Sequence, residues 1–401
     1  MSGCRSLSAA VLLFSCLSSL AWGVDITVTV EPSKTTVVTP KAPFDGKRAS
    51  VDVAILLDTS NSMDGLIGQA KSQFWTIVQQ FAKAKKDGQT PVLRVALFEY
   101  GNTRLPASEG YIRQVVQLTD DLDKLSESLF GLTTSGGDEY CGQVIQEAVK
   151  RLDWSKEPNG YKAIFIAGNE PFTQGSVDYR EACKQAIEKG IVVNTIHCGN
   201  NTEGVNGKWQ DGAKLAEGES FNIDQDRAVV QIKCPQDVII IKLSDELNKT
   251  YLWYGAKPER DRYSSNQRFQ DENAKSLGES VAASRGGVKS GHAYGNVNRD
   301  LVDTQKEDKE ILSKVKPEEL PEVLKDKSPA EREAYVKEMA AKRAKIQKEI
   351  NALTAEREAY LAKEQQRLAK ESGATTLGDA VVTTVQKQLT KSGFETGPSG
   401  K

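Results

Sequence analysis

Between residues 51 and 230, short apolar segments alternate with longer amphipathic ones. The apolar segments are VDVAILLD, VLRVALFEYG, YKAIFIAG and IVVNTIHCG, which are dominated by Val, Ile, Leu and Ala. Strands that helices cover on both faces have such near-continuous apolar sequences, and they belong to mainly parallel sheets. The segments between them, such as GLIGQAKSQFWTIVQQFAKAKK, place apolar residues at helical spacing. The alternation predicts an α/β fold with a doubly wound, mainly parallel open sheet.

One further segment, YIRQVVQLT at residues 111–119, alternates apolar and polar residues with a period of two. This pattern is typical of a strand with one buried face and one wetter face. We therefore expect it to form an edge strand of the sheet.

Residues 1–23 have the features of a signal peptide. They contain one basic residue (Arg5), an apolar stretch over residues 7–20 and the triplet Ala-Trp-Gly before Val24. The small residues of that triplet fit a signal-peptidase site, so we expect an exported chain, periplasmic or secreted. The apolar stretch is too short to span a membrane comfortably, and no later segment is long and apolar enough. Lipid attachment at Cys16 is a less favoured alternative, because Phe14 fits a lipoprotein processing site poorly.

Three segments flank the α/β region. Residues 24–50 begin with a short strand-like alternation and continue as a spacer that contains Pro, Thr and Lys. Residues 231–302 have the pattern of an irregular or helical connector. Residues 303–401 are rich in Lys, Glu and Arg and predict a charged helical extension.

The extension contains an internal repeat. AEREAY occurs at 330–335 and again at 355–360, which suits one continuous helix from 330 to 371. The apolar positions of this helix are sparse and rich in Ala. We therefore favour a solvated single helix over a coiled coil, and self-association through the helix stays open.

The charge composition argues against nucleic acid as a partner. The chain has 53 Lys and Arg residues against 55 Asp and Glu residues, a formal net charge of -2. A nucleic-acid-binding domain is expected to carry a basic footprint, and none is evident.

Four cysteines lie after the predicted signal peptide: Cys141, Cys183, Cys198 and Cys234. Export permits disulfides, and four cysteines allow three complete pairings, so we expect at least two of the four side chains to be buried or disulfide-bonded. None has CxxC spacing and the chain has two histidines, so a zinc site is weakly supported.

The first predicted strand ends in an oxygen-rich turn, DTSNS at residues 58–62. Ligands of open parallel sheets bind where the carboxyl ends of strands pass into loops, and Asp58, Ser60 and Ser62 are at such a place. One carboxylate and two hydroxyls at alternate positions suit Mg²⁺ or Ca²⁺, which take oxygen ligands. The same side chains suit caps for the following helix. The turn alone leaves both interpretations open.

DTSNS in this position resembles the metal-ion-dependent adhesion site of von Willebrand factor A-type (VWA) domains. The order of strands and helices over residues 51–230 resembles the rest of that fold. The resemblance implies a divalent cation, Mg²⁺ or else Ca²⁺ or Mn²⁺, held by Asp58, Ser60 and Ser62 with a threonine from a second loop and an aspartate from a third. It also implies that a protein partner completes the ion's shell with an acidic oxygen.

The second and third loops depart from the family pattern. In the second, Glu139 stands where the threonine is expected, with Thr133 and Thr134 as nearby substitutes. In the third, GNEP at 168–171, the expected aspartate falls on Gly168. A carboxylate at Glu139 changes the net charge around the ion and so its attraction for an acidic partner group. The predicted metal ligands are therefore Asp58, Ser60, Ser62 and Glu139, with Asn169 or Glu170 from the third loop.

The segments GGDEYCGQVI, AGNEPFTQGSVDYREAC and NTIHCGN, with the AEREAY tail, also resemble a subgroup of exported bacterial proteins. In these, a VWA domain precedes a helical tail rich in Ala, Glu and Arg. The resemblance bears on architecture and origin more than on activity. We expect a non-enzymatic protein-binding module of the cell envelope that captures an acidic group of its partner through the cation.

Two other classes of function stay open. A hydrolase would need a thiol with a nearby base, but His197 and Cys198 are adjacent on a strand and so point to opposite faces. A metal-assisted hydrolase would use Asp58 and Glu139, with Glu170 as its obvious base. A metal-independent envelope scaffold is the other class, and it differs from the binding module in that no ion would stabilise it.

Overall fold

The computed structural model describes residues 48–157, 159–224, 226, 231–372 and 377–396. The predicted signal peptide, Cys16 and nearly all of the 24–50 spacer lie outside the described residues. Among the helices of the described part, none has the length and apolarity needed to cross a membrane.

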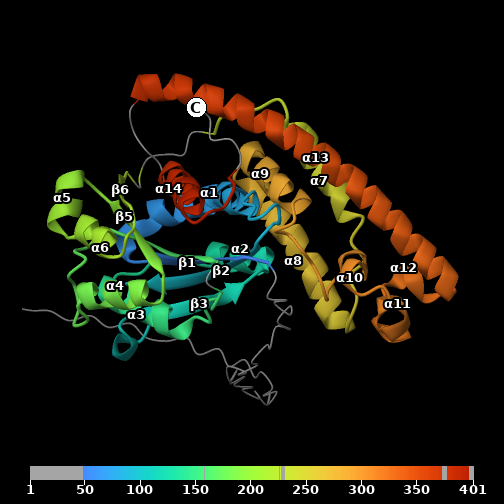
Figure 1. The fold of residues 1–401 in the computed structure, drawn as a ribbon, viewed down its shortest axis with the longest axis horizontal. Helices are drawn as coiled ribbons and strands as arrows, with labels where there is room; N and C mark the ends of the chain where they lie inside the picture. The colour runs from blue at the N-terminus through green and yellow to red at the C-terminus, as the bar shows by residue number, and fades with distance from the viewer. Residues whose placement is uncertain (1–47, 158, 225, 227–230, 373–376, 397–401) are drawn as a thin grey trace, which may run out of the picture. The chain divides into compact units, whose positions relative to one another are not determined.

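Six strands form one sheet in the order β3-β2-β1-β4-β5-β6 (Figure 1). All neighbouring strands run parallel except β2 and β3, which run antiparallel. The strands are β1 (Ser50–Asp58), β2 (Val92–Tyr100), β3 (Ile112–Thr119), β4 (Tyr161–Gly168), β5 (Val192–Cys198) and β6 (Ser220–Ile223). The prediction of a mainly parallel open sheet is confirmed, and the segment with period two is the edge strand β3.

Different helices cover the two faces of the sheet, with α1 and α14 on one side and α3 and α4 on the other (Figure 1). In β1, Val53 and Leu57 belong to the core beneath α1, whereas Ala54 and Leu56 belong to the core beneath α3 and α4. Both sides of the strand are therefore buried, which explains its unbroken apolar sequence. The helices of this part are α1 (Asp64–Ala82), α2 (Leu122–Phe130), α3 (Cys141–Arg151), α4 (Tyr179–Glu188), α5 (Asn201–Asn206) and α6 (Trp209–Leu215).

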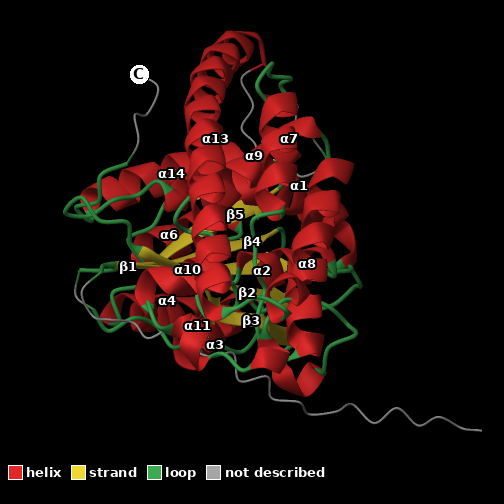
Figure 2. Ribbon diagram, turned by 90° about the vertical axis from the view of Figure 1, so that its right-hand side faces the viewer, coloured by secondary structure: helices red, strands yellow, loops and turns green. Residues whose placement is uncertain are grey.

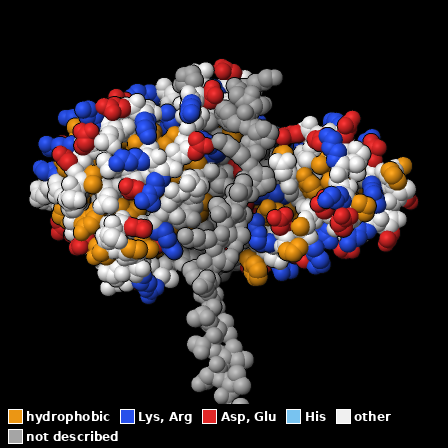
Figure 3. Space-filling model, turned by 90° about the horizontal axis from the view of Figure 1, so that it is seen from below, with side chains coloured by type: hydrophobic (Ala, Val, Ile, Leu, Met, Phe, Trp, Pro, Cys, Tyr) orange, Lys and Arg blue, Asp and Glu red, His pale blue; other side chains and the backbone are white. Residues whose placement is uncertain are grey.

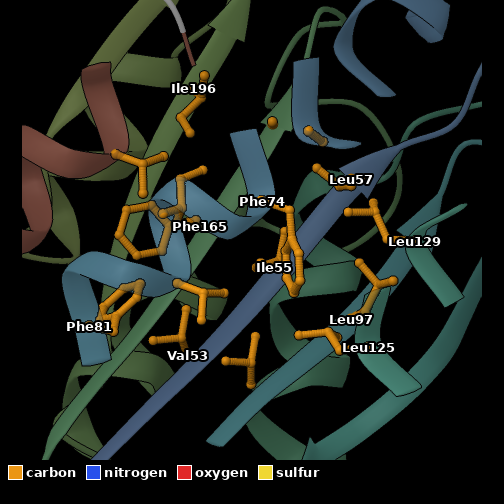
Figure 4. A pocket seen from close by; sticks show the side chains of 16 residues that line it. Val53, Ile55, Leu57, Phe74, Phe81, Leu97, Leu125, Leu129, Phe165 and Ile196 are labelled. Atoms are coloured by element: carbon orange, nitrogen blue, oxygen red, sulfur yellow. The ribbon is translucent and has the colours of Figure 1, made fainter. Parts of the chain in front are cut away.

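The core beneath α1 and α2 encloses a cavity of about 50 Å³. Only apolar side chains line it, among them Ile55, Leu97, Phe165 and Ile196 from four strands (Figure 4). Val381 of α14 also reaches it. Helix α14, which lies near the C-terminal end of the described residues, thus contributes to the hydrophobic core that packs against β1.

Most of the chain after residue 231 is helical (Figure 2). The connector predicted over 231–302 forms three helices and the start of a fourth, and its apolar segment VIIIKL lies within α7. The helices are α7 (Asp237–Asn248), α8 (Lys257–Ser276), α9 (Glu279–Ser290), α10 (Leu301–Glu307), α11 (Ile311–Lys314), α12 (Glu322–Lys325), α13 (Pro329–Ser372) and α14 (Leu377–Lys391). Three short 3-10 helices cover Asn61–Met63, Ala107–Glu109 and Pro317–Glu319.

Both copies of the AEREAY repeat lie in the single helix α13, which runs beside α7 (Figures 1 and 2). The expectation of a solvated helix is wrong for one stripe of it. Its buried residues recur every three or four positions: Val336, Met339, Arg343, Ile346, Ile350, Thr354 and Arg357. Three of these seven are polar, so a count of apolar residues underestimates the buried face. Arg343 is paired with Asp300 at 2.6 Å and Arg357 with Asp237 at 2.6 Å.

The helices after residue 231 pack against the α/β part through α9 and α14. Arg285 of α9 lies over the ring of Trp75 on α1, 4.6 Å from its centroid, and pairs with Asp123 on α2 at 2.7 Å. On α14, the amide of Gln388 donates to the side-chain oxygen of Asn194 at 2.7 Å. These contacts are buried, so the outer face of α1 is part of the interior.

Candidate metal-binding site

Asp58 ends β1 and is fully buried. Its Oδ1 atom accepts a hydrogen bond of 2.7 Å from the backbone N–H of Ser60. No hydrogen bond of ordinary geometry within the described residues involves its Oδ2 atom or the buried hydroxyl of Ser60, although the Ser60 hydroxyl and the Asn169 backbone lie close enough to lower the pKa of Asp58. The Ser60 side chain caps no helix, and the residue at the cap position of α1 is Met63. Helix capping therefore does not account for the two oxygens that are left without partners.

The second loop brings Glu139 beside Asp58. A Cβ atom on Gly101 would lie 2.7 Å from Cγ of Glu139 and 2.9 Å from Oδ1 of Asp58, so the two side chains meet at this glycine. Only 5% of the Glu139 surface is exposed. Its backbone N–H donates to the side-chain oxygen of Gln174 at 2.8 Å, which ties the second loop to the third.

The two threonines named as substitutes for Glu139 form hydrogen bonds with other residues. The hydroxyl of Thr134 donates to Asp64 at 2.7 Å, and that of Thr133 accepts from Arg104 at 2.9 Å. Glu139 is thus the side chain of this loop that lies beside Asp58.

The third loop brings Asn169 to Ser62. The Asn169 amide Nδ2 donates to the hydroxyl of Ser62 at 3.3 Å, which leaves its Oδ1 buried and without a partner in the described part of the chain. Gly168, where the family pattern places an aspartate, lies against Asp58 and Tyr100. Glu170 is half-buried, and its backbone carbonyl accepts a hydrogen bond from Trp209. Of the two third-loop residues, Asn169 is the one whose side chain forms a hydrogen bond with the DTSNS turn, through Ser62.

Burial and the charges of neighbouring carboxyl groups make Asp58 and Glu139 weak acids. Burial raises the pKa of Asp58 from 3.8 to about 7, and the charge of Glu170 adds to the increase. The pKa of Glu139 is raised from 4.5 to about 8. Burial is the largest cause, and the negative charges of Asp58 and Glu170 add to it. A cation between the carboxyl groups would oppose both effects.

The donor set consists of oxygens. Within the described residues, no group of three or more His, Cys, Asp and Glu side chains has a geometry that could hold a metal. A site here therefore depends on the hydroxyls of Ser60 and Ser62 and on the Asn169 amide oxygen, in addition to the carboxyl groups. Such a set suits hard ions such as Mg²⁺, Ca²⁺ or Mn²⁺.

The structure contradicts one alternative for the cysteines and disfavours a thiol nucleophile. All four cysteines in the described residues are buried free thiols, so the disulfide alternative is wrong for them. Burial raises the pKa of Cys141, Cys183 and Cys198. Cys198 belongs to the core beneath α1, whereas the His197 ring packs against Trp209 on the other face, as predicted for adjacent strand residues.

The sequence did not predict several contacts that hold the loops of the site in place. Tyr100 donates to the carbonyl of Ala167 at 3.0 Å, which joins the ends of β2 and β4. Gln174, His197 and Trp209 contact the second and third loops from distant segments. No spacing in the sequence marks these residues, because each acts on a loop that is far away along the chain.

The comparison with known families identifies the domain that contains this arrangement. The model of the von Willebrand factor type A domain matches residues 52–222. Residues 52–222 form a von Willebrand factor type A domain. The predicted resemblance is thereby confirmed for this part of the chain, which contains all six candidate ligands.

Solved structures that match part of this chain include several VWA proteins. Proximal thread matrix protein 1 from the mussel byssus, solved with a zinc-occupied MIDAS motif, is 13% identical, with 45% of this chain and 43% of that chain covered and a TM-score of 0.33. BatB from Bacteroides thetaiotaomicron is 19% identical over 44% of this chain and 91% of its own, with a TM-score of 0.32. The SpRpn10 VWA domain is 15% identical over 46% of this chain and 100% of its own, with a TM-score of 0.34. The chain spans less than half of the mussel protein. No curated protein matches the sequence.

Proposed function

We propose that this chain is a non-enzymatic protein-binding module that depends on a divalent cation. The observation that supports this proposal is a set of three buried oxygens without hydrogen-bond partners among the described residues: Oδ2 of Asp58, Oγ of Ser60 and Oδ1 of Asn169. Buried polar atoms are nearly always paired, and each one left unpaired costs about 1–3 kcal/mol. A cation bound by these oxygens would remove that cost.

In this proposal Asp58, Ser60, Ser62, Glu139 and Asn169 hold the ion, and Glu170 lies at its rim. Ser62 is exposed whereas Asp58 and Glu139 are buried, so a partner approaches from the Ser62 side. The partner supplies an acidic oxygen to the shell. The ion is Mg²⁺, with Ca²⁺ or Mn²⁺ as alternatives, because every donor is a hard oxygen.

Because Glu139 adds a second carboxylate, this site should bind the acidic group of a partner more weakly than a site with one carboxylate. Two ionised carboxyl groups, Asp58 and Glu139, balance the charge of a divalent ion and reduce its attraction for a third. We infer that binding of the partner is transient. The substitution Glu139→Gln keeps an oxygen ligand and removes one charge, so it should increase capture.

Thermal unfolding of the full chain tests the ion. Mg²⁺ or Mn²⁺ should raise the melting temperature of the wild type relative to EDTA, because a ligand that binds only the folded state stabilises it. Asp58→Ala should abolish the increase, and Asp326→Ala, which removes an exposed acidic residue remote in sequence from the three loops, should preserve it. No increase with the wild type would favour the metal-independent scaffold.

Capture from an envelope extract, with and without EDTA, tests the partner. Proteins retained by the wild type and lost with EDTA or with Asp58→Ala would be ion-bridged partners. Identical sets of retained proteins under all conditions would contradict the mechanism. The use of an envelope extract rests on the proposed export of the chain, periplasmic or secreted, and thus on the signal peptide predicted over residues 1–23.

Catalysis, nucleic-acid binding and self-association have less support than cation-dependent protein binding. We assign no catalytic residue, because Asp58 and Glu139 hold the ion in this proposal, and Glu170, the base that a metal-assisted hydrolase would use, lies only at the rim of the site. On the described surface shown in Figure 3, Lys and Arg side chains are interspersed with Asp and Glu, which fits a protein partner better than nucleic acid. Self-association through α13 would have to use the face that is not already packed within the chain.

A further inference from the structure

Two side chains from distant segments hold the backbone of the third loop. Nε2 of His197, at the end of β5, lies 3.2 Å from the carbonyl oxygen of Asn169. A carbonyl can only accept, so this ring nitrogen donates. Nε1 of Trp209, at the start of α6, donates to the next carbonyl, that of Glu170, at 2.9 Å. The backbone N–H of Phe172 completes the attachment by donating to the Gly207 carbonyl at 2.7 Å.

His197 and Trp209, together called the loop clamp below, are themselves fixed. Both are almost fully buried, and their ring centroids lie 5.6 Å apart. Nδ1 of His197 lies 2.9 Å from the side-chain oxygen of Asn222 on β6, a close contact that is no second hydrogen bond in the tautomer that donates from Nε2. The Asn222 amide donates to Asn201 on α5. The clamp therefore transmits the position of β6, α5 and α6 to the third loop.

The clamp is closely surrounded. A Cβ atom on Gly204 would lie 2.5 Å from the Asn222 oxygen and 2.9 Å from Nδ1 of His197. On the other side, the Trp209 ring packs edge-on against Phe172, with 4.9 Å between centroids. Gly204 and Phe172 thus pack closely against the two clamp residues.

The consequence falls on Asn169. Its side chain is short, so the position of its amide follows directly from the backbone that carries it. With the carbonyls of Asn169 and Glu170 held, the amide nitrogen meets Ser62 and the amide oxygen is left buried without a partner among the described residues. Side chains that orient ligands in this way often set metal affinity as much as the ligands themselves do.

We infer that His197 and Trp209 are positioning residues that make Asn169 the third-loop ligand of the cation. This inference rests on the proposed function, and it adds two residues that bind no ion. It explains how an asparagine one position after the family aspartate serves the site. The loop is held where the Asn169 amide, rather than a side chain at 168, faces the turn.

Four variants of the full chain test the clamp. His197→Phe and Trp209→Phe each keep an aromatic ring and remove the N–H that donates to the loop. His197→Gln retains an N–H near the same place and should rescue. Ile196→Val is the matched control, because Ile196 is equally buried and adjacent but belongs to the core beneath α1.

Two measurements are made on each variant. Isothermal titration with Mn²⁺ should show about 10- to 100-fold weaker binding for His197→Phe and Trp209→Phe, and wild-type affinity for His197→Gln and Ile196→Val. Hydrogen exchange in EDTA should show faster exchange in residues 168–172 for the two Phe variants alone. The second readout does not depend on any bound ion.

The outcomes separate the clamp from the ion site. Faster loop exchange with unchanged Mn²⁺ affinity would overturn the positioning role while leaving the metal site in place. Unchanged loop exchange would overturn the clamp itself. If the wild type binds no Mn²⁺, the proposed function fails and the positioning role fails with it, while loop exchange still reports whether the clamp holds the loop.

Discussion

The hydroxyl oxygen of Tyr100 lies 2.5 Å from the position that a Cβ atom on Gly168 would occupy. Oδ2 of Asp58 lies 3.0 Å from the same point. Tyr100 is fully buried and donates to the Ala167 carbonyl, so it cannot move away cheaply. The place where the family pattern expects an aspartate side chain is thus filled by two other residues of this chain.

An aspartate should therefore affect ion binding differently at position 168 than at position 169. We expect Asn169→Asp to bind Mg²⁺ or Mn²⁺ more tightly than the wild type, because it exchanges a neutral oxygen ligand for a charged one at a place that has room. Gly168→Asp should destabilise the protein by about 1–3 kcal/mol through overpacking and should not strengthen ion binding. Calorimetric titration and urea unfolding measure the two effects. Tighter ion binding by Gly168→Asp would show that Tyr100 does not close the position.

The stability of the ion-free protein should decrease as the pH rises from about 4 to 8. The folded state raises the pKa of Asp58 from 3.8 to about 7 and that of Glu139 from 4.5 to about 8. Between these values the folded state holds protons that the unfolded state has released, so the free energy of unfolding decreases with pH. The contribution is complete below the unfolded pKa values and is lost as the pH passes the folded ones. Thermal unfolding in EDTA across this range measures it.

Asp58→Asn is the control for this pH dependence, since its amide does not titrate. Its melting temperature in EDTA should decrease less between pH 5 and pH 8 than that of the wild type. Ion binding should show the opposite trend and strengthen with pH, because protons compete with the cation for the carboxyl groups. Parallel pH profiles of the wild type and Asp58→Asn would refute the buried-carboxyl explanation.

Loss of one member of the buried ion pair between Arg343 and Asp300 should lower the free energy of unfolding. The guanidinium of Arg343 contacts both carboxyl oxygens of Asp300, at 2.6 and 3.2 Å, and both side chains are almost fully buried. Arg343→Met leaves the buried Asp300 carboxylate without its counter-charge and removes one of the two cationic partners of Asp303, which lies 3.1 Å from the guanidinium, so it should cost about 3–5 kcal/mol in urea unfolding.

The double variant Arg343→Met with Asp300→Asn should recover a large part of this loss. The amide of residue 300 removes the charge and retains an oxygen for the N–H of Leu252, which Asp300 accepts at 2.5 Å. If the double variant is no more stable than Arg343→Met, the loss arises from packing and not from charge.

The α/β part should be unstable without the helices that follow it. A fragment of residues 48–230 lacks Arg285, which covers Trp75 and pairs with Asp123, and lacks Val381, which lines the core cavity. We expect a lower urea midpoint than that of the full chain and binding of a hydrophobic dye, because the apolar outer face of α1 becomes exposed. An unchanged midpoint would show that the helices add no stability to the sheet.

The fold of residues 51–230 was predictable because its signals are local. Each central strand is buried on both faces, so its apolar sequence is continuous, and the one strand with period two is the sheet edge. The helical part was less predictable. The buried stripe of α13 includes Arg343 and Arg357, which read as surface residues until Asp300 and Asp237 are placed opposite them.

The sequence by itself determined the sheet, the DTSNS turn and the edge at which a site would form, because these follow from short-range periodicity and from the rule that strand ends share one edge. Glu139 and Asn169 could be nominated in this way, and their role as ligands stays a prediction. Only the tertiary structure decided that Tyr100 closes the space beside Gly168, and that His197 and Trp209 hold the third loop. These contacts join segments that are far apart along the chain, and no local pattern encodes a hydrogen bond whose partner is chosen by packing.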